Sequence, residues 1–175
     1  KKNERDLLNI SESKDLTIIQ IAQYKNSEIN VSNIDIEGIK LPLLTSKVSS
    51  NNDTRILWTA PNTWLIISKR VEIIKTIEEK FNTENFAITD ISHSRAVIQI
   101  KGFQAREVLK KGCPINFNEI EKNNCAGSVF NGITIVIDCI NTDPHTFNLF
   151  TLRSFGESFY HHITDATLEF GYVGV

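Results

Sequence analysis

The pattern of apolar and polar positions is clearest in the middle of the chain. Apolar side chains alternate with polar ones over residues 95–101, which is typical of a half-buried strand. After Gly102, apolar residues recur at three- and four-residue spacing over 103–111, which predicts a short amphipathic helix. Gly112 can take the left-handed conformation that ends a helix, and Pro114 prevents the helix from resuming. The segment therefore predicts a strand, a tight turn, a helix and a stop.

A hairpin followed by a helix is predicted in the first half of the chain. Residues 16–24 are apolar on both faces and predict a central strand. Two apolar runs within 55–68 flank a Pro-Asn turn, which predicts a β-hairpin. Ser68 suits a helix N-cap, and 70–81 carries a buried helical stripe. Residues 27–44 fit neither the strand period nor the helix period.

The second half repeats this order of elements. Residues 132–152 predict another hairpin, and Ser154 with Glu157 has the spacing of a capping box at the start of a long helix. A hairpin followed by a helix thus occurs twice, which indicates an internal structural repeat. The apolar stripe of the last helix consists of Phe155, Phe159, Ile163, Ala166 and Phe170.

These patterns predict the α+β fold class. The chain has 175 residues, a length that suits one domain or two packed halves. We expect a single compact domain over 16–175, made of two related β-hairpin-plus-helix halves at about 16–85 and 86–175. Residues 1–15 are charged and weakly patterned, so we expect them to be a flexible N-terminal segment.

Composition narrows the possible partners and the compartment. The net charge is -2 and the sequence shows no basic patch, which argues against nucleic acid or an anionic membrane as partner. No apolar run approaches the roughly 20 residues that span a bilayer. The three cysteines lack the close pairs of zinc or redox sites, and their odd number fits a reducing, cytoplasmic location.

The sequence contains little recognisable chemistry. The glycine-rich nucleotide motifs and the HExxH metalloprotease motif are absent from it. Asp90, Ser92 and His93 could suggest a nucleophile with its base, but neighbours on an extended chain point to opposite faces and should not share a site. The alternative is that Asp90 and Ser92 bond to the backbone of a turn, which is the interpretation we favour.

Other reactive side chains also have structural interpretations. His161 and His162 are adjacent on the last predicted helix, whereas metal binding favours a four-residue spacing, so surface positions are expected. Cys113 follows the helix stop and is either a reactive thiol or a small buried hydrophobe, the latter being favoured. We therefore expect no catalytic, cofactor-binding or metal-binding residue in this chain.

Four large side chains remain as candidates for contact with a partner protein. Trp58 and Trp64 flank the turn of the first hairpin, and they could form a binding pair or pack against their own sheet. Arg95 begins the strand predicted over 95–101, and Arg153 lies between the second hairpin and the last helix. Tryptophan and arginine are the residues that interfaces use most often as anchors.

Several segments resemble the gamma subunit of heterotetrameric sarcosine oxidase. They are the run 90–95 (DISHSR), the strand and Gly102 turn after it, the segment 109–114 (LKKGCP) and the run 152–155 (LRSF). The turn at 61–65 (PNTWL) is similar to that family's Gly-Pro-Asp-Glu-Trp-Leu. The resemblance extends over most of the chain from Leu16 onward.

The same turn also departs from the family pattern. Ala60, Asn62 and Thr63 stand where the family usually has Gly, Asp and Glu, which keeps a turn but changes the acidic character of that surface. The family in turn resembles the folate-binding aminomethyltransferase fold, which has paired α+β halves. A shared fold does not by itself imply folate binding.

The resemblance implies a non-catalytic subunit of an oxidoreductase complex. That complex oxidatively demethylates sarcosine to glycine, transfers the one-carbon unit to tetrahydrofolate and releases hydrogen peroxide. The resemblance places FAD, FMN and NAD in the larger partner subunits, and it implies alpha, beta and delta subunits as partners in a heterotetramer.

Two alternatives remain open. One is a free-standing folate-binding protein similar to an aminomethyltransferase or a related demethylase, although such chains usually carry a further domain. The other is the folate-binding iron-sulfur maintenance family, whose motif also contains Lys-Gly-Cys. Here the residues after Lys111-Gly112-Cys113 lack the Gly-Gln-Glu of that motif, so this alternative ranks last.

Overall fold

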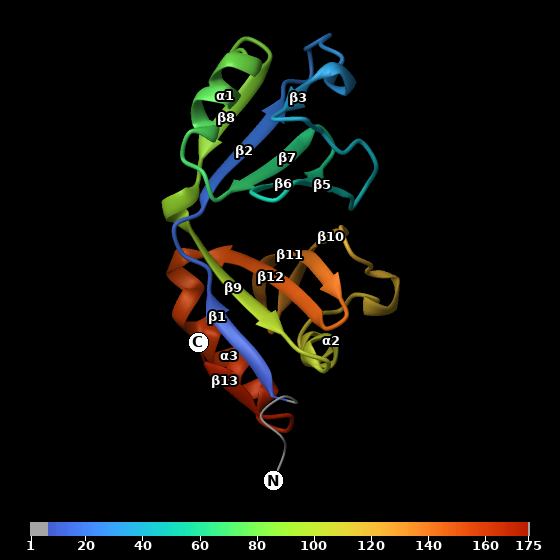
Figure 1. Cartoon of the computed structure of the whole chain (residues 1–175), viewed down its shortest axis with the longest axis vertical. Coiled ribbons are helices and arrows are strands. Elements are labelled where there is room, and N and C mark those ends of the chain that lie inside the picture. The colour runs from blue at the N-terminus through green and yellow to red at the C-terminus, as the bar shows by residue number, and fades with distance from the viewer. Residues whose placement is uncertain (1–6, 175) are drawn as a thin grey trace. The chain divides into compact units, whose positions relative to one another are not determined.

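The computed structural model describes residues 7–174 and shows two compact units (Figure 1). The first unit spans residues 15–93. The second unit combines the described N-terminal residues up to Lys14 with the residues from Ser94 onward. The chain therefore enters the second unit briefly, builds the first unit, and then returns.

The first unit is built on an antiparallel five-stranded sheet in the order β5-β6-β7-β2-β8. Helix α1 packs against this sheet, together with a small hairpin made of β3 and β4. A 3-10 turn at Val31–Asn33 precedes that hairpin. The elements are β2 (Thr17–Gln23), β3 (Asp35–Ile36), β4 (Ile39–Lys40), β5 (Val48–Ser50), β6 (Thr54–Ala60), β7 (Thr63–Ser68), α1 (Ile73–Lys80) and β8 (Phe86–Asp90).

The core of the first unit lies between α1 and one face of the sheet. Ile73 and Ile77 of α1 are buried there. Phe81 and Phe86 meet edge to face with ring centroids 5.0 Å apart, which fixes the return from α1 to β8. The 27–44 segment, which followed neither period, contributes Ile36, Ile39 and Leu41 to this core. Its strands have only two residues each, too few to show an alternating pattern.

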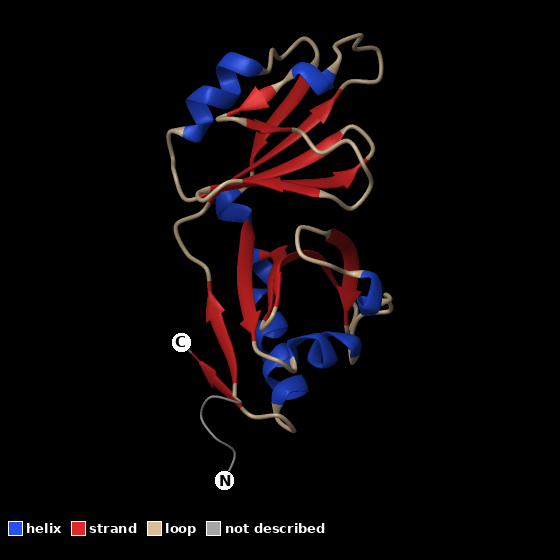
Figure 2. Cartoon of the chain, turned by 45° about the vertical axis from the view of Figure 1, so that its right-hand side comes forward, coloured by secondary structure: helices blue, strands red, loops and turns tan. Residues whose placement is uncertain are grey.

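The second unit contains a six-stranded sheet in the order β10-β11-β12-β9-β1-β13. Its neighbouring strands are antiparallel, except that β13 runs parallel to β1. Helices α2 and α3 contribute to one core on one face of the sheet (Figure 2). The elements are β1 (Leu8–Glu12), β9 (Arg95–Lys101), α2 (Ala105–Lys110), β10 (Cys125–Phe130), β11 (Ile133–Thr142), β12 (His145–Leu152), α3 (Gly156–Thr167) and β13 (Tyr172–Gly174), with 3-10 turns at Ser92–Ser94, Phe117–Glu119 and Arg153–Phe155.

The two units share a topology. Each contains a three-stranded meander, β5-β6-β7 or β10-β11-β12, that pairs along its last strand with an earlier strand, β2 or β9. Each meander is followed by a helix, α1 or α3, and then by a strand at the opposite edge of the sheet, β8 or β13. The second unit differs because β1 lies between β9 and β13. The predicted α+β fold with two related β-hairpin-plus-helix halves is confirmed.

The N-terminal segment differs from the sequence prediction. Residues 1–15 were expected to be flexible, but Leu8–Glu12 form β1 inside the second sheet, with Leu8 and Ile10 buried in the core. Residues 1–6 lie outside the described part of the chain. Two buried apolar positions in a charged stretch are too few to reveal a strand whose partners, β9 and β13, are far away in sequence.

The boundary between the halves also differs. The sequence placed it near residue 85, whereas the first unit extends to His93 because β8 pairs with β2. That the two units form one compact domain stays a prediction.

Two helices begin later than the sequence predicts. The Oγ of Ser68 does accept a hydrogen bond from the Arg70 N–H, at 3.1 Å, but α1 begins only at Ile73. The Ser154–Glu157 capping box does not form, because a 3-10 turn over Arg153–Phe155 delays the start of α3 to Gly156. The delay leaves the Phe155 side chain 46% exposed, outside the predicted stripe, while Phe159 and Ile163 are fully buried.

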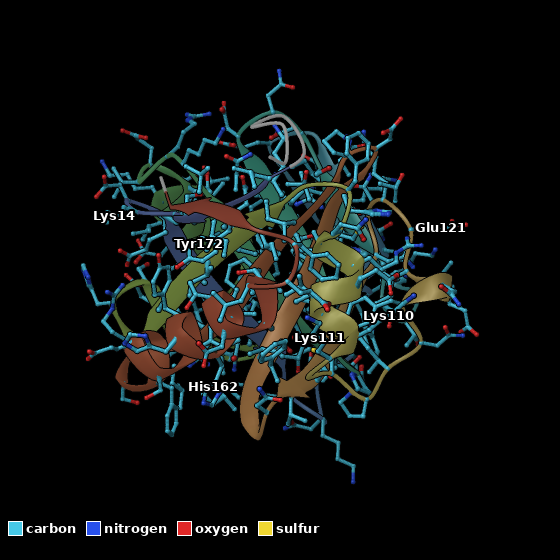
Figure 3. The ribbon with its side chains drawn as sticks, turned by 90° about the horizontal axis from the view of Figure 1, so that it is seen from below. Lys14, Lys110, Lys111, Glu121, His162 and Tyr172 are labelled. Atoms are coloured by element: carbon cyan, nitrogen blue, oxygen red, sulfur yellow. The ribbon has the colours of Figure 1, made fainter. Side chains whose placement is uncertain are left out.

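The motif at 109–114 joins three elements of the second unit. The Nζ of Lys111 donates to the Ala166 carbonyl in the last turn of α3 and pairs with Glu169, each at 2.6 Å (Figure 3). A cation at this end of a helix is favoured by the helix dipole. Gly112 does not adopt the predicted left-handed conformation. It is required for another reason, since a Cβ there would lie 2.8 Å from the Phe130 ring.

Candidate subunit interface

The two tryptophans pair directly across the hairpin of β6 and β7 but have different environments. Trp64 is only 2% exposed, and its Nε1 donates to the Pro42 carbonyl at 2.8 Å. Trp58 is half-buried. Trp64 therefore belongs to the core of the first unit, and its position does not allow direct contact with a partner protein. Trp58 stays a candidate.

The carbonyl that Trp64 bonds belongs to a loop that sequence reasoning missed. Residues 41–47, here called the 41–47 loop, connect β4 to β5. Leu41 is buried, whereas Leu43 and Leu44 are 53% and 71% exposed. A Leu-Leu pair in an irregular segment has no period that would indicate which side chains are buried. Only the exposed fractions in the structure show that Leu43 and Leu44 face solvent.

The two arginines lie together in the second unit. The Nη2 of Arg153 donates to the Arg95 carbonyl at 2.6 Å, which links the start of β9 to the turn before α3. The Nη1 of Arg153 lies 3.9 Å from Glu12 Oε1 on β1. Because the Arg153 side chain is 57% exposed, this ion pair contributes little to stability. Its guanidinium is thus held in place yet remains open to solvent.

A cavity of about 660 Å³ lies beside Arg153, between α3 and the strands β1, β9 and β13. Its apolar lining includes Ile10, Ala96 and Ile98. Charged side chains of both signs and the Tyr160 ring complete it; the charged residues are Glu12, Lys14, Arg153 and Glu157. Lys14 Nζ is 3.7 Å from Glu12 Oε2, so opposite charges are close together at this opening. Such a surface suits a polar protein segment better than a single anion.

The Asp90–Ser92–His93 run forms a turn, as the favoured interpretation predicted. The Oδ1 of Asp90 accepts from the Ser92 N–H at 2.9 Å and from the Ser92 hydroxyl at 2.5 Å. The inference that these neighbours point apart is wrong for this pair, because the chain leaves the extended conformation at Ser92. The two bonds from Ser92 are the main cause that lowers the pKa of Asp90. Ser92 Oγ also accepts the Ile18 N–H at 2.9 Å, which ties this turn to β2.

The remaining reactive side chains have structural environments. Burial raises the pKa of Cys113 to about 11, so its thiol is protonated at neutral pH, as the buried-hydrophobe interpretation expects. His161 is exposed and lies 4.0 Å from Glu157. His162 is less exposed than predicted, and its buried Nδ1 has no hydrogen-bond partner among residues 7–174.

Among residues 7–174, no group of three or more His, Cys, Asp or Glu side chains is arranged to hold a metal ion. None of the helices formed by these residues has the length and apolar character needed to cross a bilayer.

Comparisons of the sequence with known proteins point to one family. The model of the sarcosine oxidase gamma subunit family matches residues 27–169. A sarcosine oxidase subunit gamma from Corynebacterium sp. (strain U-96) is 26% identical over 137 residues, which cover 76% of this chain and 66% of that protein.

Solved structures show the same fold. A chain of heterotetrameric sarcosine oxidase from Corynebacterium sp. U-96, in complex with pyrrole 2-carboxylate, has a TM-score of 0.87 and 22% identity, over 99% of this chain and 90% of that one. The glycine cleavage system aminomethyltransferase T from Bartonella henselae has a TM-score of 0.63 and 12% identity, over 91% of this chain and 46% of that one. The predicted likeness to the aminomethyltransferase fold is confirmed.

Proposed function

Because the chain belongs to the sarcosine oxidase gamma subunit family, we propose that it is the gamma subunit of a heterotetrameric complex that demethylates sarcosine to glycine. In this reaction the N-methyl carbon passes to tetrahydrofolate, and the two electrons removed from it reduce oxygen to hydrogen peroxide. The observation that carries the proposal is the family match over 27–169. The fold likeness over 99% of the chain supports it.

The role of this chain in the complex is to dock. Its candidate catalytic groups already serve the fold: Ser92 Oγ accepts a backbone N–H, and the Cys113 thiol is buried and protonated. The flavins FAD and FMN, and NAD, belong to the larger alpha and beta subunits. The partners are the alpha, beta and delta subunits, with tetrahydrofolate as co-substrate of the whole complex. Cys113, Cys125 and Cys139 are buried and form no disulfide with one another, which favours the reducing environment of the cytoplasm.

The docking contacts proposed here involve Trp58, Arg95 and Arg153. Arg153 is held by the Arg95 carbonyl while its side chain stays exposed, which suits a pre-positioned anchor. Trp64, the fourth candidate, contributes only through the loop that it holds.

Assembly of the complex tests this role. The tagged chain is co-expressed with the alpha, beta and delta subunits, and the chains retained on the tag are quantified. Arg153→Ala should weaken retention by about 2 kcal/mol or more while the lone chain keeps its melting temperature. Arg70→Ala is a matched control, since Arg70 is also half-exposed and also paired with a glutamate, Glu37. Equal retention of the two variants would contradict a docking role for Arg153.

A further inference from the structure

The exposed leucine pair at the tip of the 41–47 loop stands out among the apolar side chains of the described residues. Leu44 is 71% exposed, the largest exposed fraction of any large hydrophobic residue in that part of the chain, and its neighbour Leu43 is 53% exposed. Two adjacent aliphatic side chains in solvent forgo the favourable free energy that burial of their exposed surface would provide. The pair is therefore costly to keep unless another surface covers it.

The loop is held in one conformation from within the first unit. Leu41 is buried in the core at one end. The next residue, Pro42, offers its carbonyl to the buried Trp64 Nε1 at 2.8 Å. At the other end, the Lys47 N–H donates to the Leu44 carbonyl at 3.2 Å, which closes a turn. A loop fixed in this way loses little conformational entropy when it binds, so it is preorganised for docking.

The leucine pair also lacks charged neighbours, unlike Leu168 and Val71, the two other large aliphatic side chains of residues 7–174 that are more than 60% exposed. Residues 41–46 contain no ionisable side chain. By contrast, Leu168 is followed by Glu169, and Val71 lies between Arg70 and Glu72. The centres of protein interfaces are depleted in charged residues, whereas their rims are polar. Residues 41–46 of this loop therefore have the composition of an interface centre.

We propose that Leu43 and Leu44 insert into an apolar pocket on one of the larger subunits of the sarcosine oxidase complex. This inference rests on the proposed function and adds a contact that the sequence candidates did not include. A partner of subunit size is required, because two leucines bury only a small part of the roughly 1,200–2,000 Å² of a stable interface. They can act as a hot spot only inside a larger contact, and the match to the gamma subunit of a heterotetrameric enzyme points to the larger subunits as the source of that contact.

The tagged chain, co-expressed with the alpha, beta and delta subunits, provides the test. The double variant Leu43→Ser/Leu44→Ser should lower the affinity for the larger subunits by about 30-fold or more. Its melting temperature as a lone chain should match that of the unmodified chain, because both side chains already face water. Leu168→Ser is the matched control, a leucine 67% exposed that should leave affinity unchanged.

The outcomes separate this inference from the proposed function. If the unmodified chain and the double variant assemble equally well, the inference is overturned and the proposed function stands. If the unmodified chain retains no larger subunit, both are overturned. If the lone chain self-associates or binds lipid vesicles and the double variant does not, the tip contacts a second copy or a membrane. Either result would also overturn the inference.

Trp64 is a positioning residue in this account, and a double-mutant comparison distinguishes that role from a general loss of stability. Trp64→Phe removes the donor to the Pro42 carbonyl and should weaken assembly. If Trp64 acts through the tip, adding this change to the Leu43→Ser/Leu44→Ser variant should weaken assembly no further. Additive losses would show that Trp64 affects assembly by another route.

Discussion

Removal of the Phe159 ring tests the core of the second unit. Phe159 lies on α3 with no exposed surface and meets Phe130 edge to face, with centroids 6.0 Å apart. Phe130 in turn packs against the backbone at Gly112. The Phe159 ring therefore contacts a side chain that is itself confined, and the space left by an alanine cannot be filled by a small shift of Phe130.

The expected loss follows from these contacts. Burial of a phenylalanine side chain is worth about 1.5–3 kcal/mol, and the cavity left behind adds to that transfer free energy. Phe159→Ala should therefore lower the free energy of unfolding by about 3–5 kcal/mol. With a urea dependence of about 2 kcal/mol per molar, the unfolding midpoint should fall by about 2 M.

Urea unfolding of the full-length lone chain, followed by circular dichroism, measures this loss. Phe155→Ala is the matched control, because Phe155 is the same residue type in the turn that leads into α3 and is 46% exposed. Its loss should stay below about 1 kcal/mol. If Phe159→Ala also cost less than about 1 kcal/mol, or the two variants lost equal stability, the assignment of Phe159 to the core would be refuted.

Three further predictions each concern a single residue. Gly112→Ala should destabilise the chain by about 1–3 kcal/mol in urea unfolding, because its Cβ would meet the Phe130 ring at 2.8 Å; Gly127→Ala, with open space around the new Cβ, should cost less. Burial lowers the pKa of His145, so the folded state should lose stability as the pH falls below about 6.5, and His145→Gln should remove that part of the pH dependence. Urea midpoints at pH 7.5 and 5.5 measure this, and an unchanged difference in the variant would contradict it. Burial raises the pKa of Cys113 to about 11, so iodoacetamide should alkylate it only on unfolding; rapid labelling of the native chain at pH 7 would contradict its assignment.

The elements predicted correctly are those whose own residues carry a sustained period. The alternation over 95–101 matches β9, and the two runs of 55–68 match the hairpin of β6 and β7. Helix α3 was found because Phe159 and Ile163 are four residues apart and both face the core. In these segments burial on one face repeats along the chain, so sequence and packing carry the same information.

The elements that were missed depend on contacts distant in sequence. Strand β1 has only Leu8 and Ile10 as buried positions, and β9 and β13 supply its pairing. The start of α3 shifted because a 3-10 turn forms first, which changes the face on which Phe155 lies. Neither effect leaves a local pattern in the sequence.

The candidate interface shows the same division. Trp58 and Trp64 flank one turn and pair across one hairpin, so local sequence does not distinguish them. A carbonyl 22 residues away, that of Pro42, satisfies the Trp64 N–H and places that ring in the core. Arg95 and Arg153 are 58 residues apart in sequence, and the hydrogen bond from the Arg153 guanidinium to the Arg95 carbonyl requires β9 to lie beside the turn before α3.

Purification of the tagged chain from its native host is the most direct test of the central claim that this chain docks in a sarcosine oxidase complex. The account predicts that three further polypeptides, identified by mass spectrometry, co-purify with it, that the preparation carries flavin absorbance, and that it releases peroxide when sarcosine is added. A lone, colourless chain that binds tetrahydrofolate tightly would contradict the account and would favour a free-standing folate-binding protein.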